Sequence, residues 1–95
     1  MIRIDVTERL VRTARKLGPE VTAKAEQQLG LLARLFGSPH LHSGLGLRKI
    51  GRRSYEIRVW RQWRIVLIQE PDRLTAYGLM NHDDVANWLK GRKGD

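Results

Sequence analysis

Residues 54–67 read Ser-Tyr-Glu-Ile-Arg-Val-Trp-Arg-Gln-Trp-Arg-Ile-Val-Leu, and this stretch is the most informative one for the fold. From Tyr55 to Val59 apolar and polar residues alternate, which is typical of a strand with one buried face. A second apolar run begins at Trp63, so the two runs predict an antiparallel hairpin. The hairpin therefore belongs to a sheet with one apolar and one polar face.

The register of this hairpin follows from side-chain parity. A three-residue loop, Trp60-Arg61-Gln62, keeps the apolar residues of both strands on one face, whereas a two-residue loop would mix the faces. The predicted pairs are Val59 with Trp63, Ile57 with Ile65, and Tyr55 with Leu67. A two-residue turn at Pro71-Asp72 continues the same core face into the next strand. It sets Leu67 opposite Ala76 and Ile65 opposite Gly78.

The rest of the chain shows the periodicities of further strands and helices. Strand patterns occupy Ile2–Val6, Leu47–Ile50 and Arg73–Met80. Helical spacing of apolar residues occupies Leu10–Leu17, Val21–Phe36 and Val85–Leu89. Thr7 and Asn81 can cap the first and last helices, and Gly18-Pro19 divides the first two. The predicted order is β-α-α-β-β-β-α, an α+β fold with a small, mainly antiparallel sheet packed by two N-terminal helices.

The composition is that of a small globular protein. Its 95 residues suffice for about one domain, so we expect a single domain over residues 1–95. The absence of cysteine excludes disulfides, thiolate metal sites and a cysteine nucleophile. No apolar run approaches the roughly 20 residues of a membrane span. Charges at Arg3 and Asp5 interrupt the place where a signal peptide is apolar. We therefore expect a cytoplasmic protein.

Positive charge gathers in one stretch of the sequence. The chain has 18 Lys+Arg against 10 Asp+Glu, for a net charge of +8. Between Arg48 and Arg64 the only acid is Glu56, and most of the basic residues are arginine, which binds phosphate in a bidentate manner. Trp60 and Trp63 in the same stretch can stack on bases. This favours a nucleic-acid or ribonucleoprotein partner over a merely solvated surface or a protein partner.

The predicted register also decides which residues meet on the polar face. Arg58 falls opposite Arg64, with Glu56 two residues along and Tyr77 on the neighbouring strand. Like charges directly opposite one another are unfavourable in a sheet, and Glu56 can offset part of the repulsion. One interpretation is an exposed pair screened by water. The other is an anion site, because a bound phosphate would reverse the sign of the interaction.

Three segments and one histidine carry a resemblance to a known family. The segments are Gly46-Leu47-Arg48-Lys49-Ile50, Tyr55-Glu56-Ile57-Arg58-Val59 and Trp63-Arg64-Ile65-Val66-Leu67, and the histidine is His82, after the last strand. Together with the length, element order and basic bias, they resemble the RelE/ParE superfamily of bacterial toxins. The resemblance implies the toxin of a type II toxin–antitoxin system with a cognate acidic antitoxin. The RelE-like branch cuts mRNA in the ribosomal A site, and the ParE-like branch inhibits DNA gyrase.

The RelE-like reaction implied by this resemblance needs no metal. The ribose 2′-hydroxyl attacks the adjacent phosphorus and leaves a 2′,3′-cyclic phosphate and a 5′-hydroxyl. Arg64 occupies the family's aromatic-Arg-apolar-apolar position and is expected to stabilise the transition-state phosphate. His82 can give or take a proton, or can be a simple capping or surface residue. Glu56 is a candidate base or an ion-pair partner of Arg58 and Arg64.

Further basic and aromatic residues are expected to contact RNA. The predicted RNA-binding set is Arg48, Lys49, Arg58, Trp60 and Arg61, with His40 and His42 as weaker candidates. Arg48 and Lys49 match the family's basic strand, which suits contacts to mRNA or ribosomal RNA. Arg58 can help to clamp the backbone.

The chain departs from the family in one respect. Many RelE-like enzymes have a catalytic tyrosine in the C-terminal segment, but residues 83–88 read Asp-Asp-Val-Ala-Asn-Trp. Either His82 takes the acid role, or Tyr77 substitutes, or the chain does not cut RNA. No metal or cofactor site is expected. We therefore expect a ribosome-dependent mRNA endonuclease, with a gyrase inhibitor and a non-catalytic nucleic-acid-binding module as the alternatives.

Overall fold

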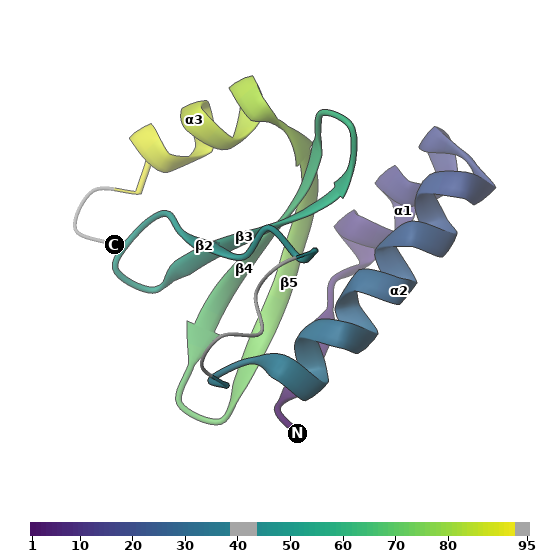
Figure 1. Cartoon of the computed structure of the whole chain (residues 1–95). Coiled ribbons are helices and arrows are strands. Elements are labelled where there is room, and N and C mark those ends of the chain that lie inside the picture. The colour runs from purple at the N-terminus through teal and green to yellow at the C-terminus, as the bar shows by residue number, and fades with distance from the viewer. Residues whose placement is uncertain (39–43, 93–95) are drawn as a thin grey trace.

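The computed structural model describes residues 1–38 and 44–92 and has an α+β architecture (Figure 1). The strands are β1 (Arg3–Val6), β2 (Arg48–Lys49), β3 (Ser54–Trp60), β4 (Trp63–Glu70) and β5 (Arg73–Asn81). The helices are α1 (Glu8–Leu17), α2 (Pro19–Leu35) and α3 (His82–Lys90). The predicted fold class is confirmed. The observed order, β-α-α-β-β-β-β-α, has one strand more than the predicted order, which contained four strands. All five strand patterns of the sequence form strands, and the stretch Leu47–Ile50 gives the two-residue strand β2.

The five strands form one sheet in the order β1-β5-β4-β3-β2. β1 runs parallel to β5, and all other neighbours are antiparallel. β1 pairs only with Arg73–Ala76, so the second half of β5 extends beyond it. This second half leads directly into α3, which places the start of that helix at the same end of the sheet as the β3–β4 turn.

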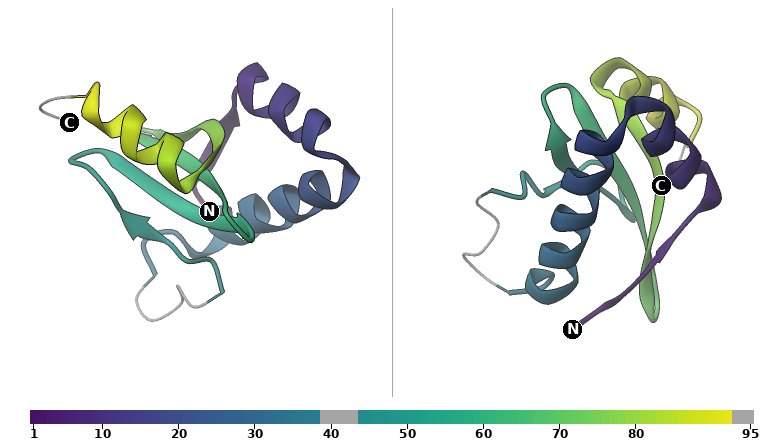
Figure 2. Two further views of the ribbon diagram at one scale, coloured as in Figure 1. Left: turned by 90° about the horizontal axis from the view of Figure 1, so that it is seen from above. Right: turned by 90° about the vertical axis from the view of Figure 1, so that its right-hand side faces the viewer.

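The helices lie on both sides of the sheet (Figure 2). α1 and α2 cover one face, and α3 packs against β4 and β5 on the other. The main core lies between the sheet and the two N-terminal helices and includes Leu10, Ala14, Val21, Ala25, Leu32, Ile57, Ile65 and Leu67. Val66 and Val85 are also buried but lie outside this cluster, on the side of α3. The sheet face turned away from α1 and α2 is therefore only partly covered.

The helix ends confirm the capping residues predicted from the sequence. The Thr7 hydroxyl accepts a hydrogen bond from the Leu10 N–H at 3.2 Å, and the Asn81 side chain accepts one from the Asp84 N–H at 2.8 Å. Each bond satisfies a backbone donor that the first helical turn leaves free. Gly18, at φ 107°, closes α1 by donating to the Ala14 carbonyl. Its positive φ is open to glycine with little strain, and Pro19 then starts α2.

The predicted register of the β3–β4 hairpin is confirmed over most of its length. Tyr55 lies opposite Leu67 and Ile57 opposite Ile65. The prediction that Val59 faces Trp63 is wrong, because a bulge between Arg58 and Trp60 makes Trp60 the partner of Trp63. The turn is therefore Arg61-Gln62, and Arg61 has a φ of 48°. Val59 keeps its core position at 2% exposure.

A second bulge changes the predicted register of β4 and β5. Leu67 lies opposite Ala76 as predicted, but Ile65 lies opposite Leu79 and not Gly78. Tyr77 is the additional residue on β5. An extra residue in one strand shifts every later pair by one position. The shift places the Leu79 side chain, 5% exposed, in the core beside Ile65 where Gly78 would leave a gap.

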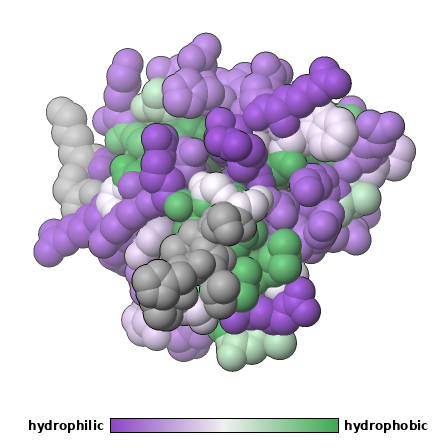
Figure 3. All heavy atoms as spheres, in the orientation of Figure 1, coloured by the Kyte–Doolittle hydropathy of each residue, from purple (hydrophilic) through white to green (hydrophobic). Residues whose placement is uncertain are grey.

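The surface is mostly polar. Figure 3 shows hydrophilic side chains over most of one face, with apolar groups reaching the surface between them. Among the described residues the exposed large hydrophobic side chains are Met1, Val6 and Trp60. In that same part of the chain, every helix is too short or too polar to cross a lipid bilayer.

Candidate functional site

The β3–β4 pairing brings two arginines together on the sheet face away from α1 and α2. Arg58 and Arg64 lie directly opposite each other, as the sequence predicted. Ile57 and Ile65, one position away on each strand, point into the core, so parity sends the arginines to the other side. Arg58 is exposed, whereas the Arg64 side chain is only 17% exposed. Two cations therefore share one pair position in different environments.

Glu56 supplies the negative charge that stabilises this arrangement. Its side chain is 7% exposed, and its two oxygens face two different arginines. Oε2 lies 3.3 Å from Arg64 Nε, and Oε1 lies 3.5 Å from Arg48 Nη2. The predicted pairing of Glu56 with Arg64 is confirmed. Its second partner is Arg48, which lies close because it pairs with Glu56 across the β2–β3 ladder. The predicted pairing of Glu56 with Arg58 is wrong, because the carboxylate oxygens face Arg48 and Arg64.

The Arg64 guanidinium is held from two sides. Besides the Glu56 contact, its Nη1 donates to the Arg61 carbonyl at 3.0 Å and to the Trp63 carbonyl at 3.4 Å. A guanidinium carries five N–H donors in a rigid fork. Because Nε and Nη1 are engaged with the protein, the orientation of the fork is set, and Nη2 takes part in none of these contacts. A preoriented donor of this kind suits an anionic ligand.

Another cation, Arg58, lies on the same face as the buried carboxylate, and we call Glu56, Arg48, Arg58 and Arg64 the polar-face cluster. Arg48 and Lys49 are both exposed on β2. Lys49 lies outside the cluster, because it pairs with Tyr55 of the core face and its ammonium lies 6.0 Å from the centre of the Tyr55 ring. Among the described residues no acidic side chain lies within ion-pair distance of Arg58 or Lys49. Cations without acidic partners are available to phosphate groups.

The segment before β2 is fitted closely onto the cluster. Gly46 has a φ of 63°, and a Cβ at this position would lie 3.0 Å from the Cβ of Arg58. The preceding carbonyl, that of Leu45, accepts a hydrogen bond from the Arg58 N–H at 2.8 Å. The buried Gln28 side chain donates to the Arg58 carbonyl at 2.8 Å and to the Gly44 carbonyl at 3.0 Å. Gln28 thus ties α2, this segment and β3 together, a supporting role that no sequence motif indicated.

His82 lies at the same end of the sheet as Arg64. It is the first residue of α3, follows the partner of Trp63, and is exposed. Arg64 itself pairs with Met80, two positions before the histidine. The strand register therefore places His82 two residues beyond the partner of Arg64, at the same end of the sheet.

Tyr77 has ring contacts that the sequence did not predict. Its ring stacks on Trp88 of α3 at a centroid distance of 5.6 Å. The guanidinium of Arg9 lies 5.2 Å from the centre of the same ring, and that of Arg92 lies 4.5 Å from the Trp88 ring. The side chain is thus engaged in a stack that joins α1, β5 and α3. Arg9 gave no sequence signal, because it lies on an exposed helix turn.

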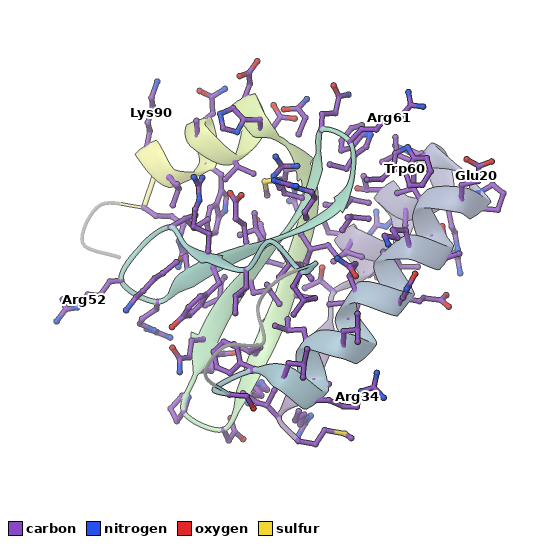
Figure 4. All side chains as sticks on the ribbon, in the orientation of Figure 1. Glu20, Arg34, Arg52, Trp60, Arg61 and Lys90 are labelled. Atoms are coloured by element: carbon purple, nitrogen blue, oxygen red, sulfur yellow. The ribbon has the colours of Figure 1, made fainter. Side chains whose placement is uncertain are left out.

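Trp60 and Arg61 lie at the end of the β3–β4 hairpin. Figure 4 shows Arg61 at the tip and Trp60 near the start of α2, where Glu20 is also labelled. The Arg61 guanidinium lies 5.8 Å from the centre of the Trp60 ring. These two residues are connected to the polar-face cluster through the bond from Arg64 to the Arg61 carbonyl.

The two histidines suggested as weaker RNA contacts, His40 and His42, lie outside the described residues. Within residues 1–38 and 44–92, no three His, Cys, Asp or Glu side chains gather in a way that would hold a metal ion.

The fold is similar to the folds of several solved structures. A chain of the Escherichia coli DinJ–YafQ toxin–antitoxin complex is similar at 13% identity, with a TM-score of 0.66 over 88% of this chain and 96% of that chain. YafQ from E. coli is similar at 13% identity, with a TM-score of 0.57 over 90% of this chain and 98% of that one. A chain of the RelB–RelE antitoxin–toxin complex from Methanococcus jannaschii gives 15% identity and a TM-score of 0.61 over 90% and 98%.

These similarities cover 88–90% of this chain and show that it shares the fold of those chains. No family model matches the sequence, and no curated protein matches it. The backbone fold is therefore shared with those chains, while most side chains differ between them.

Proposed function

We propose that this chain is the toxin of a type II toxin–antitoxin pair and that it cuts mRNA on the ribosome, in the cytoplasm and without a metal ion. The RelE-type fold supports the toxin role. The observation that carries the nuclease activity is the Arg64 guanidinium, oriented by Glu56 and by two hairpin carbonyls within a cationic surface. This orientation supports the proposal, because a fixed guanidinium can stabilise charge on a phosphate.

The chemistry needs three functions at one phosphate. A base removes the proton of the 2′-hydroxyl as the 2′-oxygen bonds to phosphorus, a cation stabilises the phosphorane oxygens, and an acid protonates the departing 5′-oxygen. Arg64 supplies the cation. His82 supplies the acid, because a histidine can donate a proton near neutral pH and this one is exposed at the same end of the sheet.

Glu56 is the candidate base and at the same time the group that positions Arg64. Its Oε1 has no hydrogen-bond partner among the described residues and faces Arg48 at 3.5 Å. The Arg48 side chain is 63% exposed, so it can move from the carboxylate to an RNA phosphate. That movement would free Oε1 for the 2′-hydroxyl proton while Oε2 stays on Arg64. Tyr77, engaged with Trp88 and Arg9, is given no part in the proton transfers.

The test is primer extension on mRNA bound to programmed ribosomes, with the wild-type chain added at stoichiometric concentration. We expect primer-extension stops at new 5′-hydroxyl ends within the message, and a 2′,3′-cyclic phosphate when the 3′ end of the upstream fragment is analysed. An intact message together with growth arrest and a DNA-damage response would contradict the nuclease and favour gyrase inhibition. An intact message with salt-sensitive RNA binding and normal growth would favour a non-catalytic binding module.

A further inference from the structure

A groove separate from the polar-face cluster opens at the end of the β3–β4 hairpin. Its cavity measures about 500 Å³ and lies between residues 17–21, where α1 passes into α2, and residues 60–63 of the hairpin. Ligand sites commonly have volumes of about 300–1,000 Å³. The groove is therefore large enough for one planar organic group such as a nucleobase.

The bulge in β3 turns an indole toward this groove. The bulge interrupts the strict alternation of side chains after Arg58, and Trp60 pairs with Trp63. Trp60 therefore does not take the side that alternation from Val59 would give it. The Trp60 side chain is left 36% exposed, and both tryptophans line the cavity. A half-exposed indole offers an aromatic face on which any base can stack.

Glu20 adds a hydrogen-bond acceptor to the same cavity. It follows Pro19 in the first turn of α2, is exposed, and lines the groove together with Trp60 (Figure 4). An ionised carboxylate only accepts hydrogen bonds, and it can accept two in parallel. Among the RNA bases, guanine alone has two adjacent donors, N1–H and the N2 amino group, on its pairing edge. A carboxylate beside a stacking surface therefore favours guanine.

The groove also borders the proposed reaction site. Arg64 donates from Nη1 to the Arg61 carbonyl at the groove's edge, while its Nε contacts Glu56 in the polar-face cluster. Arg61 places a second cation 5.8 Å from the Trp60 ring. An RNA strand with a phosphate at Arg64 thus has a cationic path to the groove, so a nearby base of that strand can enter it.

We propose that this groove binds an unpaired guanine of the RNA, stacked on Trp60 with its pairing edge on Glu20. The inference rests on the proposed function and adds a base preference to it. A lysine of a protein partner would also fit an indole and a carboxylate. Arg61 and Arg64 oppose that occupant, because they already place positive charge beside the groove, and the same charges attract an RNA backbone.

The experiment measures binding alone, with no ribosome present. Labelled uridine-rich pentaribonucleotides that differ only in a central guanine or adenine are titrated with the protein in low salt and followed by fluorescence anisotropy. We expect the guanine oligonucleotide to bind roughly 5- to 100-fold more tightly. Trp60→Ala should weaken binding of both by roughly 5- to 100-fold, and Trp60→Phe should retain most of the affinity.

Glu20→Gln should abolish most of the guanine preference while adenine binding is kept or improved. Its control is Glu26→Gln, which removes the same charge from an exposed site on α2 outside the groove and should leave the preference intact. Equal affinities for the two oligonucleotides, or a Trp60→Ala protein that is folded and binds normally, would overturn the proposal. So would a groove that binds a lysine-rich peptide but shows no base preference.

The two proposals fail separately. If the base preference is found but the wild-type chain leaves the message uncut, or Arg64→Ala cuts at the wild-type rate, the groove proposal stands and the nuclease proposal falls. If cleavage depends on Arg64 while the oligonucleotides bind alike, only the groove proposal falls.

Discussion

The two faces of the sheet are built from alternate residues of the same strands, yet they do different things. On the face beneath α1 and α2, Ile57, Ile65 and Leu67 are completely buried. On the other face, Glu56 of β3 and Arg64 of β4 carry opposite charges 3.3 Å apart. One face thus buries apolar area and stabilises the fold. The other face holds charged side chains in fixed positions. Burying those charges costs desolvation free energy, but the fixed charges suit a binding surface.

The comparison predicts that changes on the polar side alter activity, and changes on the core side alter stability. The largest effect is expected at His82. His82→Ala should slow mRNA cleavage by roughly 10²–10⁴-fold if it transfers the proton. His82→Gln should be as slow, because an amide does not exchange a proton in this way. Single-turnover primer extension measures the rate, and Asn87→Ala, an exposed change on the same helix, should cut normally. A normal rate for His82→Ala would remove this residue from the site.

The core face is tested by Ile65→Ala. Ile65 is 0% exposed, and a large-to-small change at such a position costs about 2–5 kcal/mol of unfolding free energy. Arg58→Ala on the paired strand should change the unfolding free energy by less than about 0.5 kcal/mol, because Arg58 is exposed. Urea denaturation measures both. Equal losses would show that the two faces do not divide stability and function.

Arg64 is expected to affect both activity and stability. Removing its charge should lower the cleavage rate by about 10²–10³-fold while ribosome association persists. Arg64→Ala also leaves Glu56 without its nearest cation, so Arg64→Lys is the sharper variant. Lysine keeps a charge beside Glu56 but lacks the planar fork, and it should fold normally and still cut more slowly than wild type. A wild-type rate in Arg64→Lys would mean that charge alone suffices, and a wild-type rate in Arg64→Ala would refute the assignment.

Arg48 should affect binding more than chemistry. Arg48→Ala removes one phosphate contact, so it should weaken RNA affinity and reduce the slope of log affinity against log salt by about 1. Arg34→Ala, an exposed arginine at the far end of α2, is the matched control (Figure 4). Anisotropy titrations over a range of salt concentrations measure the slope. An unchanged slope for Arg48→Ala would exclude Arg48 from the interface.

The smallest effect concerns the partner. We expect an acidic antitoxin segment to cover the polar face and compete with RNA for it, because that face carries the exposed cations Arg48 and Arg58. Hydrogen exchange on the complex should then be slowed along Arg58–Arg64. Protection restricted to α1 and α2 would place the antitoxin on the opposite side of the molecule and contradict this expectation.

Parity made much of the hairpin and of the site predictable. From the alternation in β3 and β4 it could be predicted that Arg58 lies opposite Arg64 and that Glu56 lies beside Arg64, because the face of a side chain follows from its position along a regular strand. The same argument failed at Val59 and at Gly78, where bulges shift the register. A bulge reflects how well side chains fill the core, as Leu79 does, and local alternation carries no information about that fit.

Local patterns in the sequence were enough to predict the α+β class, the helix caps, the basic stretch and the pairing of charges across the hairpin, since each depends on residues close together along the chain or on strict alternation. The contacts between residues of different elements follow from the tertiary structure. Arg48 reaches Glu56 only through the β2–β3 ladder, Tyr77 meets Arg9 and Trp88 only because three elements converge, and Glu20 shares a groove with Trp60 only because the hairpin ends beside the α1–α2 junction. Such contacts depend on the packing of whole elements, which short-range patterns do not encode.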